Sequence, residues 1–207
     1  MSKVTAVKHR RPGFMKWLTH LVVRMLGWRL EGEAPKENKY VAIFAPHTSN
    51  WDAFFGLCIR FGIEERSASW MLKDNFFRFP VAGLLRWLGA IPIDRGRASN
   101  VVNPVVEIFN ERDEMVLGIT PEGTRKRVPK WKKGFYYIAV KANVPILMCY
   151  VDFARKVAGI GPILYPTGDI DADMRTFRDF YSTISPKYPD NWGPVWEWNT
   201  PQSARQD

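Results

Sequence analysis

The sequence predicts an α/β fold: a single domain in which a mixed, mostly parallel sheet is flanked by helices. Three observations support this prediction. The chain has 207 residues, which suits one domain, and 46% of them are hydrophobic, which suffices for a sizeable core. Short apolar runs of strand length alternate along the chain with segments of helical periodicity. Only two cysteines occur, so no disulfide framework takes the place of a packed core.

Residues 1–30 are predicted to form a basic, amphipathic segment that associates with membranes. The basic cluster of residues 8–11 precedes a helical pattern over 14–28, in which large apolar side chains recur every three or four positions. Such a helix lies in the headgroup region of a bilayer, and the alternative is a helix packed on the domain. Lys16 interrupts the apolar stretch, so we expect neither a signal peptide nor a membrane span.

Residues 31–184 are predicted to form the main domain. Strands are expected where short apolar runs meet turn residues, and helices where apolar residues recur at helical spacing. In chain order, the predicted elements are a strand over 41–45, a helix over 51–60, a strand over 67–72, a helix over 76–88, a strand over 90–93, a helix over 103–110, a strand over 115–119, a helix over 136–142, strands over 144–151 and 160–164, and a helix over 171–181.

Proline and glycine set several of these boundaries. Pro46 stops the first strand, Pro80 breaks the second helix near its start, and Pro121 begins the turn that ends the fourth strand. Gly134 precedes the next helix. The tail over 185–207 is rich in proline and tryptophan without clear periodicity, so we expect it to pack irregularly, with its last residues disordered.

His47 and Asp52 stand where the first strand gives way to a helix. Ser49 and Asp52 fit the Ser-x-x-acid pattern of a helix capping box, which is the plain structural reading of this aspartate. A catalytic role for this pair is compatible with the cap, because a capping carboxylate is rigid and can hold one imidazole nitrogen while the other acts as general base. With three histidines and no further ligands at suitable spacing, we expect no metal site.

A second group of candidate residues lies on the turn after a buried strand: Glu122, Gly123, Thr124 and Arg125. Gly123 permits a tight backbone, and Arg125 offers the bidentate fork that suits phosphate. Glu122 is expected to orient that arginine or to contact a substrate hydroxyl. An ordinary surface turn with an ion pair is the alternative. Together the two segments predict a general base with its orienting acid and a separate clamp for an anionic substrate.

Four blocks resemble, in order and spacing, those of the glycerolipid acyltransferases, which include the 1-acylglycerol-3-phosphate acyltransferases. The blocks are residues 47–52, residues 89–95 with Lys73 upstream, residues 121–125 followed by 131–134, and residues 144–146. The resemblance covers roughly residues 40–165. The chain departs from the family pattern at Met148-Cys149-Tyr150, and the tail after Asp169 matches nothing in it.

The resemblance implies a glycerol-3-phosphate acyltransferase-like fold and transfer of a fatty acyl chain from acyl-CoA or acyl-carrier protein to the hydroxyl of a lysophospholipid such as 1-acylglycerol-3-phosphate. His47 is then the general base, oriented by Asp52, with neither a covalent acyl-enzyme nor a cofactor. The helix over 76–88 is expected to line an acyl-chain channel, to dip into the bilayer, or simply to pack in the core. By the same resemblance, the substrate-binding residues are Lys73, Arg95, Glu122, Gly123, Thr124 and Arg125, with the two arginines on the acceptor's phosphate.

The net charge of +9 predicts an anionic partner, such as an acidic carrier protein, coenzyme A phosphates or an anionic membrane surface. A peripheral or monotopic protein on the cytoplasmic side of the cell membrane is expected. Two alternatives stay open: a His/Asp-dependent transferase or hydrolase of a soluble phosphorylated substrate, and a non-catalytic basic module that binds lipid or nucleic acid. No nucleic-acid-binding motif occurs, so no such partner is expected. The oligomeric state stays open.

Overall fold

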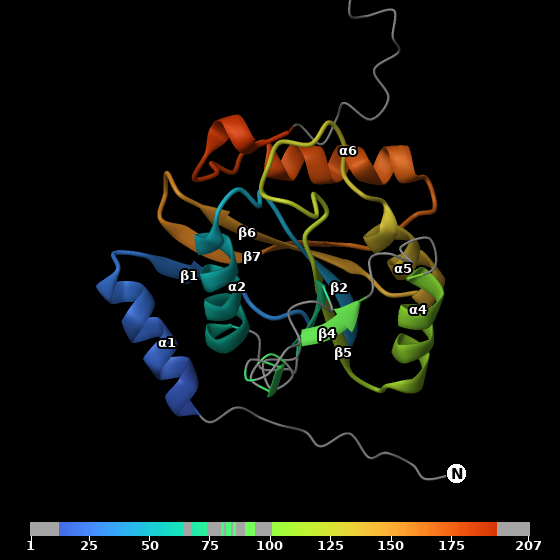
Figure 1. Cartoon of the computed structure of the whole chain (residues 1–207), viewed down its shortest axis with the longest axis horizontal. Coiled ribbons are helices and arrows are strands. Elements are labelled where there is room, and N and C mark those ends of the chain that lie inside the picture. Colours follow the sequence, from blue (N-terminus) through green and yellow to red (C-terminus); the bar gives the residue numbers. More distant parts are fainter. Residues whose placement is uncertain are drawn as a thin grey trace, which may run out of the picture.

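The computed structural model describes residues 13–63, 68–73, 80, 82–83, 85, 90–93 and 101–193. In these ranges seven strands form one sheet, in the order β1-β7-β6-β2-β5-β3-β4. β6, β2, β5, β3 and β4 are mutually parallel, whereas β7 runs antiparallel to β6. The mixed, mostly parallel sheet predicted from the sequence is confirmed (Figure 1). The strands are β1 (Arg29–Glu31), β2 (Lys39–Phe44), β3 (Ala68–Lys73), β4 (Ala90–Ile93), β5 (Met115–Ile119), β6 (Ile146–Asp152) and β7 (Val157–Leu164).

Helices cover both faces of the sheet. α2, with α1 packed beside it, covers one face, and α4, α5 and α6 cover the other (Figure 1). None of the helices in the described ranges combines the length and apolar character needed to cross a bilayer. The helices are α1 (Gly13–Met25), α2 (Asn50–Gly62), α4 (Val102–Glu111), α5 (Gly134–Ala142), α6 (Ile170–Tyr181) and the short 3-10 helix η3 (Pro189–Asn191).

The central strand β2 shows why two helical layers form. Successive side chains of a strand point to opposite faces of the sheet. Val41 and Ile43 enter the core beneath α4, α5 and α6, whereas Tyr40 and Ala42 pack against α2. All four side chains are buried. A strand that is buried on both faces carries a continuous apolar run, and that run is what predicted this strand from the sequence.

α6 is tied to the sheet by the side chain of Tyr181, its last residue. The hydroxyl of Tyr181 lies 3.1 Å from the carbonyl oxygens of Ile43 and Cys149, which belong to the neighbouring strands β2 and β6. The ring is fully buried, and this burial raises the pKa of Tyr181 well above its usual value. The hydroxyl therefore stays a neutral donor that links the adjacent strands β2 and β6 to α6.

Most predicted elements agree with the structure to within a few residues, and the differences have local causes. The helix predicted over 14–28 ends three residues early. Gly27 adopts a φ of 73°, and Trp28 turns back to stack on Phe55 at a centroid distance of 4.0 Å. β7 begins at Val157, three residues before its predicted start. β1 was not predicted, because its three residues are too few to show an alternating pattern.

Several sequence predictions concern parts of the chain that the structure does not describe. Arg95, the basic cluster of residues 8–11 and the tail beyond residue 193 lie outside the described residues, and so does most of the helix predicted over 76–88. The domain boundaries after residues 30 and 184 stay a prediction.

Candidate active site

The loop that joins β2 to α2 carries His47 and ends in a helix cap. The Ser49 Oγ accepts a hydrogen bond from the backbone N–H of Trp51 (3.1 Å), and the Ser49 N–H donates to Oδ2 of Asp52 (2.7 Å). The Ser49 side chain also accepts from the backbone N–H of Asp52, and this bond with the Ser49 N–H···Asp52 bond forms the capping box that the Ser-x-x-acid pattern predicts. The start of α2, and with it the position of Asp52, is therefore fixed by local interactions.

The carboxylate of Asp52 accepts more than the capping bond. Its Oδ2 also accepts from the backbone N–H of Thr48 (2.7 Å), and its Oδ1 accepts from the hydroxyl of Ser49 (3.2 Å). Asp52 is buried, with 7% of its surface exposed. Hydrogen bonds from three donors hold this buried carboxylate in one orientation, with Oδ2 toward His47.

His47 faces this carboxylate through one ring nitrogen. Its Nδ1 lies 3.4 Å from Oδ2 of Asp52, which is within ion-pair distance but longer than a tight hydrogen bond. Such contacts are often long without substrate and shorten in the reactive complex. The carboxylate favours the proton on Nδ1, which leaves Nε2 as the nitrogen that can accept a proton. The side chain is 19% exposed, so a substrate can reach it.

Glu122 approaches the same loop from the neighbouring strand. β5 ends at Ile119, and the turn that follows is closed by a hydrogen bond from the Gly123 N–H to the Thr120 carbonyl oxygen (3.1 Å). Because β2 and β5 are adjacent and parallel, both loops leave the same edge of the sheet. The Oε1 of Glu122 accepts a hydrogen bond from the backbone N–H of His47 (2.9 Å). Glu122 thus positions the backbone of the candidate base.

Burial keeps Glu122 protonated over a wide pH range. Its side chain is 4% exposed, and Oε2 has no hydrogen-bond partner within the described part of the chain. Desolvation is the largest effect and raises the pKa of Glu122, the hydrogen bonds from the backbone of His47 and from its own backbone lower it, and the charge of Asp52 raises it; together they bring the pKa to about 8. At neutral pH the site therefore holds one carboxylate charge, that of Asp52, beside the imidazole.

Comparison with known proteins assigns this arrangement to a family. A family model described as Acyltransferase matches residues 29–152, more than half of the chain, and this span includes His47, Asp52 and Glu122. The chain belongs to the acyltransferase family. The resemblance to glycerolipid acyltransferases that the sequence shows is confirmed.

Two curated relatives of this acyltransferase-family chain are 1-acyl-sn-glycerol-3-phosphate acyltransferases. The human beta form is 29% identical over 140 residues, which cover 63% of this chain and 49% of the relative. The enzyme from Limnanthes alba is 28% identical over 138 residues, which cover 61% and 46%. The chain thus spans about half the length of the curated relatives it matches.

A solved structure of similar fold is the 1-acyl-sn-glycerophosphate (LPA) acyltransferase from Thermotoga maritima. The two chains superpose with a TM-score of 0.56 at 20% identity, over 80% of this chain and 73% of that one. At this identity the similarity shows the fold alone, and it confirms the predicted acyltransferase-like fold.

The turn of this acyltransferase-family chain that carries Glu122 continues into its exposed residues. Gly123 has a φ of 68°, and a Cβ at this position would lie 3.0 Å from Nζ of Lys132. The hydroxyl of Thr124 accepts a hydrogen bond from the backbone N–H of Lys126 (3.3 Å), and Arg125 is exposed. The turn therefore presents its arginine to solvent close to the His47 loop, and the predicted contacts of these residues with substrate stay predictions.

The segment over 131–134 lies beside this turn, because the Lys132 N–H donates to the carbonyl oxygen of Pro121 (2.9 Å). Trp131 is buried and packs edge-to-face on Tyr181 at 5.5 Å. Residues 121–125 and 131–134 are thus in contact, and Trp131 anchors them to α6.

The other predicted substrate-binding residues are Lys73, of which the structure describes the backbone, and Arg95, of which it describes nothing. Lys73 is the last residue of β3, which pairs in parallel with β5, so its backbone lies at the same edge of the sheet as Glu122. Its side chain and the whole of Arg95 lie outside what the structure describes. Their predicted roles stay predictions.

The two cysteines are poorly suited to covalent catalysis. Cys58 and Cys149 are both buried, and neither forms a disulfide. Burial raises the pKa of the Cys58 thiol to about 11, so almost no thiolate forms at neutral pH. Within the described ranges, no three His, Cys, Asp or Glu side chains gather in an arrangement that could hold a metal ion.

Sequence reasoning missed two contributors to this site. Tyr188, on the C-terminal segment, donates its backbone N–H to the hydroxyl of Thr48 (3.3 Å), which sits between His47 and the helix cap. Lys187 lies over the ring of Trp51, next to Asp52. No sequence pattern links residues so far apart, and the proline- and tryptophan-rich tail gave no periodic signal.

The pKa of Glu122 leads to a test by Glu122→Gln, which keeps an acceptor oxygen for the His47 N–H but removes the ionisable group. Between the usual carboxyl pKa of 4.5 and about 8, the folded wild type holds a proton that the unfolded chain releases. The wild type's free energy of unfolding therefore falls as pH rises through this window. Between about pH 5.5 and about pH 8.5, the free energy of unfolding of the variant should rise by roughly 3 kcal/mol relative to that of the wild type, as measured by denaturant unfolding.

The control is Glu107→Gln, which removes an exposed carboxylate from α4. Its unfolding free energy should follow that of the wild type at both pH values. A difference between Glu122→Gln and the wild type that stays constant with pH would show that Glu122 is already ionised in the folded chain.

Proposed function

We propose that this chain transfers a fatty acyl group from acyl-CoA or acyl-carrier protein to the hydroxyl of a lysophospholipid such as 1-acylglycerol-3-phosphate. The observation that carries this proposal is the buried Asp52 carboxylate facing Nδ1 of His47 at 3.4 Å, at the carboxyl edge of an acyltransferase-family sheet. The named activity of the two curated relatives supports the choice of acceptor.

The proposed reaction needs a base, but no nucleophile on the protein. Nε2 of His47 takes the proton of the acceptor hydroxyl while the hydroxyl oxygen attacks the thioester carbonyl carbon. The tetrahedral intermediate then collapses, the carbon–sulfur bond breaks, and the leaving thiolate takes the proton from the imidazolium. Asp52 stabilises the imidazolium between these two steps. The products are an ester and a free thiol.

The positions of the predicted binding residues fit a phosphorylated acceptor. The exposed guanidinium of Arg125 follows the turn whose Glu122 holds the His47 backbone, so phosphate bound there brings a nearby hydroxyl toward the imidazole. Lys73 and Arg95 are proposed to join it. For Glu122 the structure supports a positioning role, because its carboxyl group is buried against the loop.

A basic surface next to this turn is proposed to receive the anionic donor. It comprises residues that, apart from the partly buried Lys133, are exposed: Arg125, Lys126, Arg127, Lys130, Lys132 and Lys133. The phosphates of coenzyme A and an acidic carrier protein both fit such a surface.

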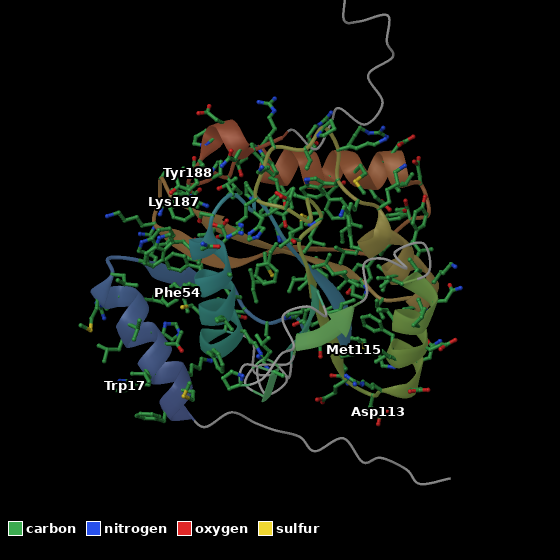
Figure 2. All side chains as sticks on the ribbon, in the orientation of Figure 1. Trp17, Phe54, Asp113, Met115, Lys187 and Tyr188 are labelled. Carbon is green, nitrogen blue, oxygen red and sulfur yellow. The ribbon has the colours of Figure 1, made fainter. Side chains whose placement is uncertain are left out.

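The membrane contact is proposed to be α1. One side of this helix packs on the domain through the buried Val23, while an apolar stripe stays exposed to solvent. Phe14, Trp17, Leu21 and Met25 of this stripe are between 39% and 78% exposed, and Trp17 projects from the outer side of α1 (Figure 2). An exposed apolar stripe on a strongly basic chain suits the interface of an anionic leaflet, which favours the cytoplasmic side.

The base mechanism predicts that His47→Ala lowers turnover by at least about 100-fold, because a positioned general base contributes that much or more. Asp52→Asn should be similarly impaired, since asparagine can still accept the backbone hydrogen bonds but lacks the charge that stabilises the imidazolium. The measurement is product formation from labelled acyl donor, with thermal unfolding and circular dichroism to confirm the fold. Wild-type turnover in a folded His47→Ala protein would exclude His47 as the base.

Arg125→Ala should raise the KM for a phosphorylated acceptor roughly tenfold while kcat changes little, because the guanidinium binds a phosphate that does not react. Arg112→Ala is the matched control: this exposed arginine follows α4 and precedes β5, at the opposite edge of the sheet. It should leave both constants unchanged. A fall in kcat at constant KM in Arg125→Ala would assign the guanidinium to the transition state instead.

Replacing both Trp17 and Met25 with Gln should weaken sedimentation with anionic vesicles by at least about tenfold, since each inserted apolar side chain contributes on the order of 1 kcal/mol. Acylation of a short-chain, water-soluble acceptor should stay unchanged. The control replaces Tyr137 and Val140, two exposed apolar residues of α5 on the other face of the sheet. Equal vesicle binding by the α1 variant and the wild type would exclude α1 as the membrane contact.

A further inference from the structure

The chain beyond α6 returns to the catalytic loop. The carbonyl oxygen of Ser185 accepts a hydrogen bond from the backbone N–H of Phe153 (2.9 Å), and the backbone N–H of Tyr188 donates to the hydroxyl of Thr48 (3.3 Å). Thr48 follows His47 directly, and its own N–H is bound to the Asp52 carboxylate. Residues 185–188, which we call the C-terminal segment, therefore lie against the loop that holds the base. This segment lies outside the family match, which ends at residue 152.

Three aromatic rings hold the ammonium group of Lys187 in this segment. Its Nζ lies 5.3 Å from the ring centroid of Trp51, 5.9 Å from that of Phe153 and 5.5 Å from that of Tyr188. These distances are within the range of cation–π attraction. Lys187 and Tyr188 lie together on the side of the molecule where Phe54 projects from α2 (Figure 2). The rings fix the position of the cation beside the start of α2.

In the part of the chain that the structure describes, this cation has aromatic contacts but no counter-charge. Within the described residues, the ammonium of Lys187 forms no hydrogen bond and no ion pair. Aromatic faces attract a cation but do not neutralise its charge, and the three N–H groups of an ammonium remain able to donate to an anion. Lysine binds phosphate as a point charge, so it does not need the bidentate geometry with which arginine binds phosphate.

The segment that carries Lys187 lies on one side of the loop that carries His47. Glu122 binds the backbone of His47 on the turn that leads to Arg125, whereas Tyr188 binds the adjacent Thr48 on the segment that carries Lys187. The catalytic loop is thus held between two segments, and each of them presents a cation. The proposed reaction brings together two substrates that both carry phosphate.

We infer that Lys187 is a phosphate-binding residue of the active site, which holds the phosphate of the acceptor or of the thioester donor. The inference rests on the proposed function. Lys187 adds to the predicted binding residues a position that the family pattern does not contain, and it gives the C-terminal segment a role in choosing phosphorylated substrates.

The test compares Lys187→Met, Lys187→Arg and the control Lys36→Met. Methionine keeps the length of the side chain and its contact with aromatic rings but removes the charge, whereas arginine keeps the charge and also stacks on aromatic rings. Lys36 is exposed and precedes β2, at the end of that strand opposite to His47. Its replacement removes one positive charge far from the site.

Two pairs of probes separate the sources of phosphate. The acceptor pair is 1-hexanoylglycerol 3-phosphate and 1-hexanoylglycerol, and the donor pair is an acyl-CoA and the uncharged N-acetylcysteamine thioester of the same acyl group. Binding of each acceptor and of each donor to the full chain is measured by calorimetry, one substrate at a time, and KM and kcat are measured with all combinations. Calorimetry gives a result even if the chain transfers no acyl group, so failure of the proposed function and failure of the inference are distinguishable.

Lys187→Met should weaken one phosphorylated probe roughly tenfold and leave its uncharged partner unchanged, since a charge-assisted hydrogen bond is lost. Lys187→Arg should restore most of the affinity, and Lys36→Met should behave as the wild type. A loss confined to the phosphorylated acceptor assigns the residue to the acceptor, and a loss confined to acyl-CoA assigns it to the donor. Equal losses for charged and uncharged probes, or no loss at all, would overturn the inference and leave Lys187 as a structural tie.

Discussion

Two backbone amides and one serine hydroxyl converge on the carboxylate of Asp52, and the same carboxylate faces the imidazole of His47. One side chain thus caps α2, shapes the loop before it and orients the candidate base. These tasks need the same property, a buried and fully bonded anion in a fixed orientation. Because one carboxylate performs all three tasks, a histidine on a loop is held in a fixed position. The loop is bonded to the first turn of a helix, and that helix is packed on the sheet.

The strands supply the second constraint on the site. Parallel neighbours bring their carboxyl ends to one edge, so the loops after β2 and β5 meet without any long connection. Tyr181 fastens the carbonyl groups of Ile43 and Cys149 to α6 close to where β2 leaves the sheet. Glu122 then joins the two loops directly through the His47 backbone. The loop that carries the candidate base is therefore held by the sheet and by the carboxyl group of Glu122.

Whether a contact in the fold or in the candidate site could be predicted from the sequence depends on how far apart its two residues are along the chain. Local patterns sufficed for β2, for the capping box of Ser49 and for the pairing of His47 with Asp52, because each is written within a few residues. Glu122 was expected to contact substrate or an arginine, yet its carboxyl group accepts from a backbone 75 residues away. The contact of Lys187 with Trp51 likewise depends on how distant elements pack, which hydrophobic periodicity does not encode. Resemblance to a family singled out the turn of residues 121–125 but said nothing about the C-terminal segment.

α2 links the proposed membrane contact, α1, to the proposed phosphate site. α1 packs beside α2 and bonds its far end, where the His20 ring meets the carbonyl oxygen of Gly62, while Trp51 stands in the first turn of α2. Trp51 and Gly62 are 11 residues apart in α2, so these points are separated by roughly 17 Å. Trp51 and Tyr188 are both nearly half exposed, and aromatic residues with polar atoms favour the membrane interface. If α1 binds the bilayer as proposed, the exposed rings of Trp51 and Tyr188 offer a second point of contact at the start of α2, and Lys187, which lies over both rings, then meets the level of the headgroups. A lysophospholipid could present its phosphate there without leaving the membrane.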